Sequence, residues 1–270
     1  MKIISWNVNG IRACEKKGFL KFLKKENPDF LCIQESKAHE DQLSTELLSP
    51  TWSKEILAKA DYQSIWSSAE RKGYSGVASY IRSDLACNVK TTFGIGIKKF
   101  DTEGRFIIHE YTKNNKKFLL YNVYFPNGAA SEERHNFKQE FLKKFLKHLK
   151  KKMQENLQII VVGDYNIAHK AIDIHDPVRL AETSGFLPEE RQWFDTFLAS
   201  GFVDSYRSIY PQKKDKYSWW SYRSLARQNN KGWRLDYICS TKKLASKIKK
   251  VDILNKQLGS DHCPVLCEWD

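Results

Sequence analysis

The feature of this sequence that most constrains its fold is a series of short apolar runs, spread along the whole chain, that are typical of β-strands. They are rich in β-branched and aromatic residues, and Gly, Pro, Asn or Asp bounds many of them. Several are apolar at consecutive positions, as strands are when other layers cover both of their faces. The runs predicted as strands are 2–7, 30–35, 62–69, 76–83, 105–112, 117–125, 157–164, 217–222, 234–240, 247–254 and 263–270.

Helical signals are fewer and lie between these runs. The predicted helices are 18–27, 132–153 and the segment from Pro188 to Gly201. In the longest, apolar side chains recur every fourth position, at Phe137, Phe141, Phe145, Leu149 and Met153. Its other face is expected to be solvent exposed and carries Lys138, Lys143, Lys144, Lys147, Lys150 and Lys151. This mixed order favours an α/β (α+β) chain with large antiparallel or mixed sheets, in a single domain over 1–270.

Composition narrows the class of protein. Hydrophobic residues make up 41% of the 270 residues, as in a globular chain. The net charge of +13 favours a polyanionic partner, either nucleic acid or an anionic membrane surface, although solvated surface lysines would give the same sum. The six cysteines form no C-x-x-C pair, which argues against a zinc ribbon and a disulfide framework and indicates reduced thiols.

The N-terminal stretch MKIISWNVNG contains no targeting signal that we recognise. Ser5 and Asn7 come too early for the apolar region of a signal peptide. No apolar run approaches the roughly 20 residues that a membrane-spanning helix needs. We therefore expect a soluble, intracellular monomer, in the cytoplasm or nucleoid.

Polar side chains gather at or near the ends of several predicted strands. They are Asn7, Asn9, Gln34, Glu35, Lys37, Asp164, Asn166, Asp236, Asp261 and His262. Each cluster alone is weak, because Asp-x-Asn usually forms a turn with its own backbone. Several strand ends can meet at one rim of a layered fold, so their coincidence predicts one site. Oxygen-bearing side chains suit Mg²⁺ or Mn²⁺, and the scarcity of Cys and His pairs disfavours zinc.

The stretch VVGDYN shows how such a strand end would work. The apolar run before it would hold the turn rigidly, and Gly163 would let the backbone turn without a Cβ in the way. Asp164 and Asn166, two positions apart, can face the same side, while Tyr165 points the other way as support.

A longer series of motifs runs from residue 5 to residue 266: SWNVNGIRA, IQESK, YNVYFPNG, VVGDYNIAH, SGFLPEERQWFD, YSWWSYR, GWRLDYI and GSDHCPV. The series resembles the exonuclease III family of apurinic/apyrimidinic (AP) endonucleases, within the wider endonuclease/exonuclease/phosphatase superfamily that includes DNase I. GDYN and SDH alone would indicate only the superfamily, whereas GFLPEERQWFD, WWSYR and GWRLDY are specific to its DNA-repair branch. The resemblance implies a four-layered α/β sandwich, with two mixed sheets face to face and helices outside.

The resemblance also implies an activity and roles for residues. The activity is hydrolysis of the phosphodiester 5′ to an abasic site in duplex DNA, leaving a 3′-hydroxyl and a 5′-deoxyribose phosphate, with some 3′–5′ exonuclease activity. The implied Mg²⁺ shell, which Mn²⁺ could also occupy, is Glu35, Asp261, Asn7 and Asn9. The implied catalytic groups are Asp164, Asn166, His262, Asp236 and Tyr124. We choose Asp164 as the group that orients or deprotonates the attacking water, with the His262–Asp236 pair as the alternative base.

Substrate contacts follow from the same resemblance. The residues implied to line an apolar slot for an extrahelical abasic sugar are Trp219, Trp220, Trp233 and Leu235, with core packing as the alternative. The residues implied to hold DNA phosphates or enter a groove are Arg12, Lys37, Tyr74, Arg105, Asn127 and Arg223. The sequence departs from the family at Ala129 and Ala130, where some relatives carry a basic residue that inserts into DNA. Arg223 occupies a second wedge position.

Other functions on this scaffold remain open at this point. One is a predominantly 3′–5′ exodeoxyribonuclease or a broader lesion endonuclease, which the loops decide. Another is a phosphoinositide-type phosphatase, against which the DNA-branch motifs and the aromatic slot weigh. The last is a non-catalytic DNA-binding protein, which is disfavoured because every candidate catalytic position holds a chemically competent residue.

Overall fold

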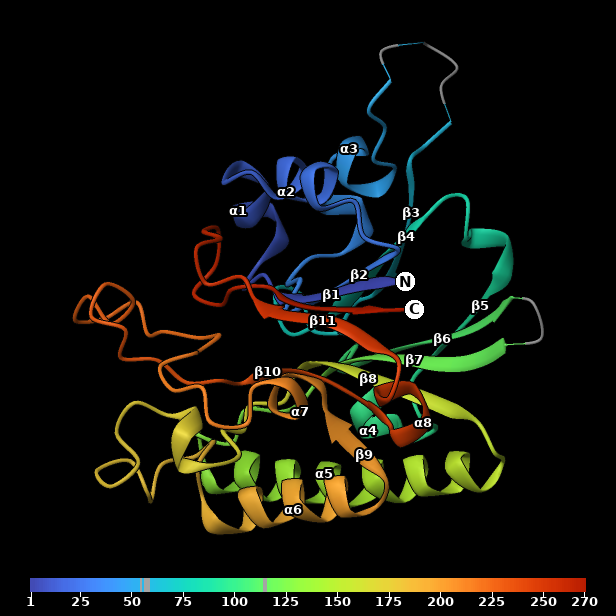
Figure 1. The fold of residues 1–270 in the computed structure, drawn as a ribbon. Helices are drawn as coiled ribbons and strands as arrows, with labels where there is room; N and C mark the ends of the chain where they lie inside the picture. Colours follow the sequence, from blue (N-terminus) through green and yellow to red (C-terminus); the bar gives the residue numbers. More distant parts are fainter. Residues whose placement is uncertain (54, 56–58, 114–115) are drawn as a thin grey trace.

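The structure, a computed structural model, describes residues 1–53, 55, 59–113 and 116–270 of the chain. Two six-stranded sheets lie face to face, and helices cover the outer face of each (Figure 1). In the first sheet β1 and β2 are parallel, in the second β7 and β8 are parallel, and the other pairs are antiparallel. The predicted four-layered α/β sandwich with mixed sheets is therefore confirmed.

The strand order of the first sheet is β11 (Ile248–Ile253), β12 (Val265–Trp269), β1 (Lys2–Asn7), β2 (Phe30–Gln34), β4 (Val77–Arg82) and β3 (Tyr62–Ser67). That of the second is β5 (Val89–Phe93), β6 (Phe106–Lys113), β7 (Lys116–Tyr124), β8 (Gln158–Asp164), β10 (Asp236–Thr241) and β9 (Phe202–Asp204). The chain termini meet at one end of the first sheet, where the amino group of Met1 donates to the Trp269 carbonyl (2.6 Å; Figure 1).

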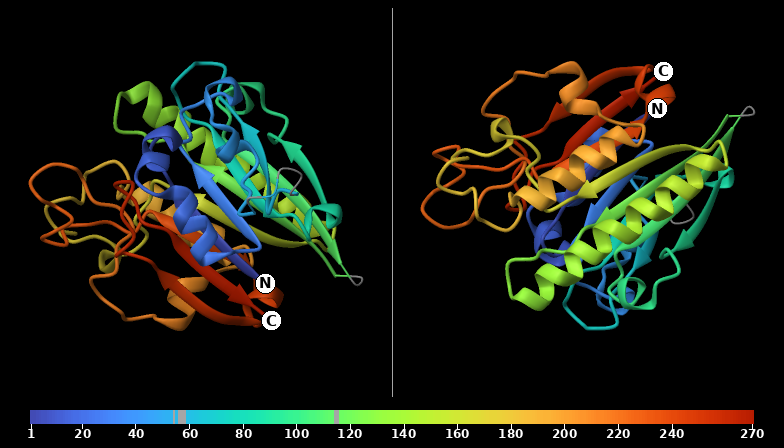
Figure 2. Two further views of the ribbon diagram at one scale, coloured as in Figure 1. Left: turned by 90° about the horizontal axis from the view of Figure 1, so that it is seen from above. Right: turned by 90° about the horizontal axis from the view of Figure 1, so that it is seen from below.

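The helices cover the sheets from outside. The first sheet is covered by α1 (Ile11–Lys16), α2 (Phe19–Glu26) and α3 (Thr45–Leu48). The second is covered by α5 (Glu132–Gln154) and α6 (Pro188–Ala199), which lie side by side across it (Figure 2). Shorter pieces are α4 (Lys98–Asp101), α7 (Ser205–Ile209), α8 (Lys242–Ala245) and the 3₁₀ turns Glu40–Gln42, Ala86–Asn88 and Ala171–Asp173.

Three clusters of buried apolar side chains fill the spaces between the four layers. A single strand contributes side chains to two of these clusters. In β1, Ile3 packs between the sheets, whereas Ile4 packs toward α1 and α2. In β8, Ile160 packs between the sheets, whereas Ile159 packs toward α5 and α6. Successive strand side chains point to opposite faces, so a strand covered on both faces is apolar at consecutive positions. This is the pattern that marked these runs in the sequence.

Ten of the predicted strands and all three predicted helices are confirmed within a few residues, but the strand expected at 217–222 is wrong. Trp219 in that segment makes only isolated bridges, to Trp233 and to His262. Those partners lead into β10 and β12, which belong to different sheets. The segment therefore links two sheets and cannot extend a ladder with either. The sequence reading missed β5, β9, α1 and the shorter helices.

One expectation about α5 is also wrong. Lys138 was expected on the solvated face, but its side chain is fully buried and pairs with Glu190 of α6 (2.5 Å). The helix α6 packs along this side of α5 and covers Lys138, the first lysine of that face. The other five lysines of that face are exposed, as expected: Lys143, Lys144, Lys147, Lys150 and Lys151.

Two sequence-based expectations about the chain's chemistry agree with the structure. All six cysteines are free, five of them buried and Cys87 exposed. Over the ranges that the structure describes, no helix has both the length and the apolar character needed to cross a bilayer.

Candidate active site

The polar side chains singled out in the sequence meet at the end of the sandwich opposite the chain termini. Asn7 ends β1 and Asp164 ends β8, while Asp236 begins β10 and lies directly opposite Asp164 in the antiparallel pair. Tyr124 ends β7, opposite Asp164 in the parallel pair. A parallel neighbour brings its end to the same edge of the sheet, and an antiparallel neighbour brings its start. Segments far apart in the sequence are thereby placed around one site.

Gly163 makes this meeting possible at the β7–β8 pair. Its φ is 145°, and a Cβ added there would lie 1.8 Å from the Val123 carbonyl oxygen. The absence of a side chain therefore lets the two strands stay paired up to Tyr124 and Asp164. Beyond the strand, Asn166 has a φ of 51° and its backbone N–H donates to Asp164 Oδ1 (2.8 Å). Tyr165 points away and stacks on Phe125 in the core, as the sequence predicted.

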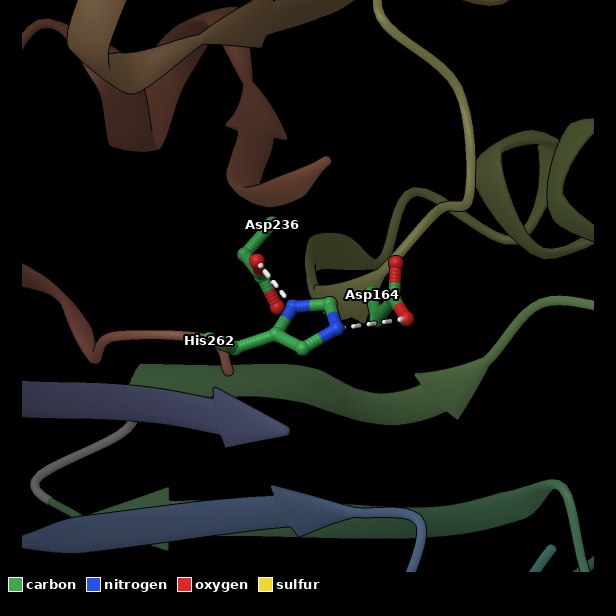
Figure 3. Close-up of side chains that lie close together, drawn as sticks. All are labelled: Asp164, Asp236 and His262. Atoms are coloured by element: carbon green, nitrogen blue, oxygen red, sulfur yellow. Dashed lines mark hydrogen bonds and ion pairs between the residues drawn. The ribbon is translucent and has the colours of Figure 1, made fainter. Parts of the chain in front are cut away.

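A line of three buried side chains crosses the centre of the site (Figure 3). His262 Nδ1 lies 2.8 Å from Asp236 Oδ2, and its Nε2 lies 3.9 Å from Asp164 Oδ2. Burial alone would lower the pKa of His262, but Asp236 and Asp164 outweigh it and raise that pKa to about 10. Burial raises the pKa of Asp164 to about 7, against the opposing effect of His262. The two carboxylates therefore favour the protonated form of the imidazole, and its Nε2 faces Asp164.

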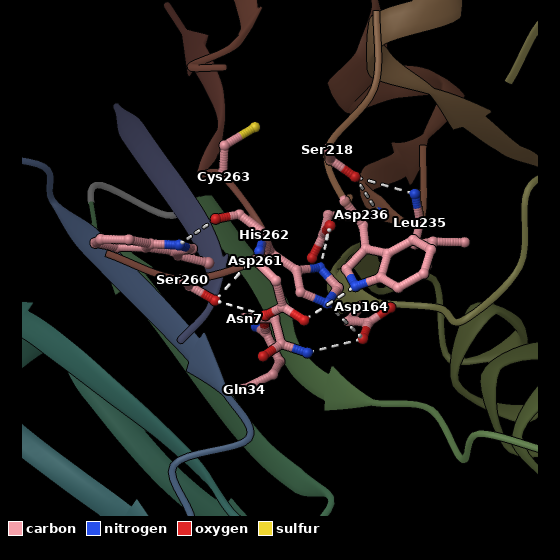
Figure 4. Close-up of polar contacts among 12 residues, drawn as sticks. Asn7, Gln34, Asp164, Ser218, Leu235, Asp236, Ser260, Asp261, His262 and Cys263 are labelled. Carbon is pink, nitrogen blue, oxygen red and sulfur yellow. Dashed lines mark hydrogen bonds and ion pairs between the residues drawn. The ribbon is translucent and has the colours of Figure 1, made fainter. Parts of the chain in front are cut away.

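The backbone on either side of this line is fixed by small polar residues that sequence reasoning missed (Figure 4). Ser218 Oγ accepts from the backbone N–H groups of Leu235 and Asp236, both at 3.0 Å. Ser260 Oγ accepts from His262 N (3.2 Å), and Trp6 Nε1 donates to the His262 carbonyl (3.2 Å). Ser218, the first serine of YSWWSYR, could have been noticed only through the motif, because a serine in an apolar run has no distinctive local signal.

Amides connect Asp164 to the neighbouring strand ends. Asn7 Nδ2 donates both to Asp164 Oδ2 (2.9 Å) and to Glu35 Oε2 (3.0 Å). Asn166 Nδ2 donates to the Phe125 carbonyl (2.9 Å), and Asn127 Nδ2 donates to Asn166 Oδ1 (3.2 Å). The structure thus brings Asn7, Glu35, Asp164, Asn166 and Asn127 into one hydrogen-bonded row.

A second row holds the remaining residues expected around a metal ion. Lys37 Nζ lies 3.0 Å from Glu35 Oε1 and donates to Asn9 Oδ1. Asn9 Nδ2 donates to Asp261 Oδ1 (2.9 Å), and Trp219 Nε1 donates to Asp261 Oδ2 (3.1 Å). Burial would raise the pKa of Asp261, but His262 and these hydrogen bonds keep it lowered. The carboxylate of Asp261 therefore remains ionised.

Two groups of ligand-type atoms could hold a metal ion. Asp164, Asp236 and His262 offer atoms that all lie within 4.8 Å of one another. Both ring nitrogens of His262 face carboxylates here, which leaves neither nitrogen directed at an open position. The row of Glu35, Asn9 and Asp261 offers the oxygen atoms that Mg²⁺ prefers. The ammonium of Lys37 contacts two of these residues, Glu35 and Asn9, so their oxygens already face a positive charge.

These rows border a cavity of about 490 Å³. Trp219, Trp233 and Leu235 form its apolar wall, and Thr183, Ser184 and Gly185 of the loop before α6 line it as well. Ser184 and Gly185 were missed, because small residues in a loop carry no local signal of function. Trp220 does not line this cavity: it is 2% exposed, and the Arg227 guanidinium stacks on it (4.6 Å).

The remaining residues expected to contact DNA lie in different surroundings. Tyr74 and Asn127 line a neighbouring cavity of about 530 Å³. Arg105 lines it too but is 1% exposed and donates to Glu103, Tyr74 and the Tyr124 carbonyl. This buried guanidinium fixes the two tyrosines from behind. Arg12 and Arg223 are exposed, on α1 and on the loop after Trp220.

A buried ion network holds the start of β10 from outside the site. Asp173 is fully buried and pairs with Arg234 (2.8 Å) and Arg207 (2.5 Å), and Arg234 also pairs with Asp204 (2.8 Å). Burial would raise the pKa of Asp173, but the two guanidinium groups outweigh it and hold it at about 2. Arg234 directly precedes the wall residue Leu235 and the catalytic candidate Asp236.

We expect Asp173→Asn to lower the free energy of unfolding at pH 7 by about 3–5 kcal/mol, because the buried Arg234 would lose one of its two carboxylate partners and Arg207 would lose its own. The folded-state pKa of Asp173 lies below the unfolded value near 3.9, so its charge stabilises the fold above about pH 4. That contribution is lost as the pH falls toward 2. Urea titrations from pH 7 to pH 3 should show the difference between the two proteins shrinking, and the exposed Asp41→Asn should show none. A difference that stays constant with pH would contradict the assignment.

The fold and the site together define a phosphoesterase built on a two-sheet sandwich, with carboxylates, amides and a charged imidazole around one open cavity. The chain belongs to the Endonuclease/Exonuclease/phosphatase family, whose sequence profile matches residues 4–262. It is similar to the exodeoxyribonuclease of Bacillus subtilis (strain 168), with 37% identity over 266 residues and 98% of each chain covered. It is also similar to the DNA-(apurinic or apyrimidinic site) endonuclease of Dictyostelium discoideum, with 38% identity over 98% of this chain and 69% of the relative.

Comparison with solved structures supports the same family. The crystal structure of an AP endonuclease from Leishmania major superposes with a TM-score of 0.86 at 29% identity, over 98% of this chain and 86% of that one. The resemblance inferred from the motifs is therefore confirmed, and the chain is a phosphodiesterase nuclease of this family.

Proposed function

We propose that this nuclease is a Mg²⁺-dependent AP endonuclease, which hydrolyses the phosphodiester 5′ to an abasic site in duplex DNA. The observation that carries the proposal is that one cavity joins an apolar wall to the catalytic candidates. The apolar wall of Trp219, Trp233 and Leu235 and the catalytic candidates Asp164 and His262 border the same cavity. A sugar held against that wall would place its phosphate beside the carboxylate and the imidazole.

The wall suits a sugar that has left the helix. Trp219 and Trp233 meet edge to face, with ring centroids 6.0 Å apart, and Trp219 is held by its hydrogen bond to Asp261. The small residues Ser184 and Gly185 line the same cavity, and Gly185 lies directly against Trp233. Extruding a nucleotide costs least where no base must be unstacked, so this slot would select abasic sites.

The reaction needs an attacking water, a stabilised phosphoryl group and a protonated leaving oxygen. Asp164 is proposed to orient or deprotonate the water, since its carboxylate lines the cavity within reach of the phosphate position. Asn166 and His262 are proposed to donate to phosphoryl oxygens, and Asp236 fixes the tautomer and charge of the imidazole. Tyr124, which lines the same cavity at the end of β7, is proposed to assist at the leaving oxygen.

A Mg²⁺ ion held by Glu35 and Asp261, with Asn7 and Asn9 beside it, would neutralise charge on the phosphate and the leaving oxygen. We expect Glu35→Gln to raise the Mg²⁺ concentration needed for half-maximal cleavage by about tenfold or more, because it removes a charged ligand. Asp236→Asn should lower the rate at saturating Mg²⁺ and leave that midpoint nearly unchanged. A midpoint shifted by Asp236→Asn and not by Glu35→Gln would place the ion in the Asp164–Asp236–His262 group instead.

The net charge of +13 and the exposed basic residues Arg12 and Arg223 predict that DNA affinity depends on salt. We expect the affinity for abasic duplex DNA, measured with EDTA to prevent cleavage, to fall steeply between about 50 and 200 mM salt. Removing Arg223 should weaken binding and reduce this slope. An affinity that does not respond to salt would argue against a phosphate-binding surface here.

One incubation tests the proposed function against its alternatives. The substrate is a labelled duplex with a single tetrahydrofuran abasic analogue, and an undamaged duplex of the same sequence is the control. A single nick 5′ to the analogue, dependent on Mg²⁺ and stopped by EDTA, is the expected product. Stepwise shortening from 3′ ends of both duplexes would instead favour an exodeoxyribonuclease, the name carried by the similar Bacillus subtilis protein. Binding without cleavage would overturn both.

A further inference from the structure

The buried pair of Lys138 and Glu190 has no part in the chemistry described so far, yet it lies directly behind the site. Both side chains are fully inaccessible to solvent, and Lys138 Nζ lies 2.5 Å from Glu190 Oε1. Burying two charges is costly, and an apolar pair often stabilises such a helix contact equally well. The stability of the α5–α6 contact is therefore a weak explanation for this pair.

The remaining hydrogen bonds of the pair explain it better, because two of the three reach the backbone of residues that line the catalytic cavity. Lys138 Nζ donates to the Asn166 carbonyl (2.8 Å). Glu190 Oε2 accepts from the backbone N–H groups of Gly185 (2.6 Å) and Leu187 (3.1 Å). The bond to Leu187 is the ordinary capping contact of a glutamate in the first turn of a helix. The bonds to Asn166 and Gly185 have no role in capping.

These two bonds hold two neighbouring parts of the cavity lining, because a Cβ added at Gly185 would lie only 3.2 Å from the Asn166 carbonyl oxygen. Asn166 lies at the end of β8 in the left-handed conformation, with φ of 51°, which costs free energy unless its surroundings hold it there. Gly185 lies directly against the Trp233 ring in the cavity lining. One ion pair between α5 and α6 thus fixes the backbone of a phosphate-binding candidate and the backbone beside the apolar wall.

We infer that Lys138 and Glu190 are positioning residues, which hold Asn166 and the wall at Gly185 in the geometry needed for cleavage. The inference rests on the proposed function. Lys138 acts on the transition state through Asn166, so its loss lowers kcat. Glu190 acts on the slot through Gly185, so its loss raises KM for the abasic duplex.

The test compares Lys138→Met and Glu190→Gln with Lys143→Met, an exposed lysine of the same helix. Rates are divided by the concentration of folded protein, measured by circular dichroism and thermal unfolding. We expect Lys138→Met to lower kcat by about 10²-fold, the size of effect that a displacement near 1 Å can produce, and to change KM little. Lys138→Arg, which keeps the charge and the donors, should recover part of the loss, and Lys143→Met should behave as the wild type.

A double-mutant cycle separates positioning from general destabilisation. If Lys138 acts through Asn166, then Lys138→Met should cost far less activity in an Asn166→Ala background than in the wild type. Equal losses in both backgrounds, or an unchanged kcat per folded molecule, would overturn the inference. Should Lys138→Met not fold, Lys138→Arg and Glu190→Gln enter the same cycle. Nicking by the wild-type protein is measured first. If the wild type does not nick abasic DNA, the proposed function is refuted, and the positioning role is then tested on 3′-end hydrolysis.

Discussion

Asp164→Asn is expected to lower kcat for abasic-site cleavage by about 10³-fold or more and to leave the affinity for abasic duplex DNA within a few-fold of the wild type. The substitution keeps the size of the side chain and removes its charge and its ability to accept a proton. Asp164 Oδ1 and Oδ2 accept hydrogen bonds from Asn166 N and Asn7 Nδ2, so an amide can keep one of these contacts. Binding should survive, because a negative charge next to the DNA phosphate is removed.

The measurement pairs single-turnover cleavage at saturating Mg²⁺ with fluorescence anisotropy in EDTA. The matched variant is Asp236→Asn, which removes the carboxylate on the other side of the same imidazole. If Asp164 handles the proton of the attacking water, its substitution should cost more than that of Asp236. Cleavage by Asp164→Asn within about tenfold of the wild type, with Asp236→Asn inactive, would transfer the role of base to the His262–Asp236 pair.

The sequence was informative about this site where the signal was local. Asn7 and Asp164 each end an apolar run, Asp236 stands near the start of one, and such strand termini are visible in the residues themselves. It could also be predicted that these residues lie close together in space, because strand ends meet at one edge of a sheet. The split between Trp219 and Trp220 could have been predicted in the same way. Neighbours in an extended segment point to opposite sides, and the structure places Trp219 at the cavity and Trp220 in the core.

Features that depend on distant partners were not predictable from the sequence. Lys138 has the spacing of an exposed lysine, and only the packing of α6 beside α5 buries it against Glu190, 52 residues away. Arg105 looks like a DNA contact in the sequence, but Glu103 and two tyrosines enclose it. The left-handed conformations of Asn9, Glu35, Lys37 and Asn166 likewise come from the tertiary structure, since none of these residue types requires them.

Gly163→Ala is expected to produce the other large effect, and it acts on the fold and on the site together. The new Cβ would lie 1.8 Å from the Val123 carbonyl oxygen, which is backbone in the neighbouring strand and cannot rotate away. Strands β7 and β8 would have to separate at this point. We expect the free energy of unfolding to fall by roughly 4 kcal/mol or more, at the upper end of what single substitutions produce.

The folded fraction of Gly163→Ala should also be a poor enzyme. Tyr124 and Asp164 are the next pair in the same register, so separation of the strands moves both catalytic candidates away from His262. A displacement near 1 Å can reduce a rate by about 10²-fold.

Gly96→Ala is the matched control, because Gly96 also has a positive φ, of 80°, but a Cβ there would meet nothing within 4 Å. Its cost isolates the backbone strain, about 1 kcal/mol, from the clash. Urea unfolding and cleavage per folded molecule would be measured for both variants, and a Gly163→Ala protein as stable and active as Gly96→Ala would show that Gly163 is not needed to keep the two strands in register at the site.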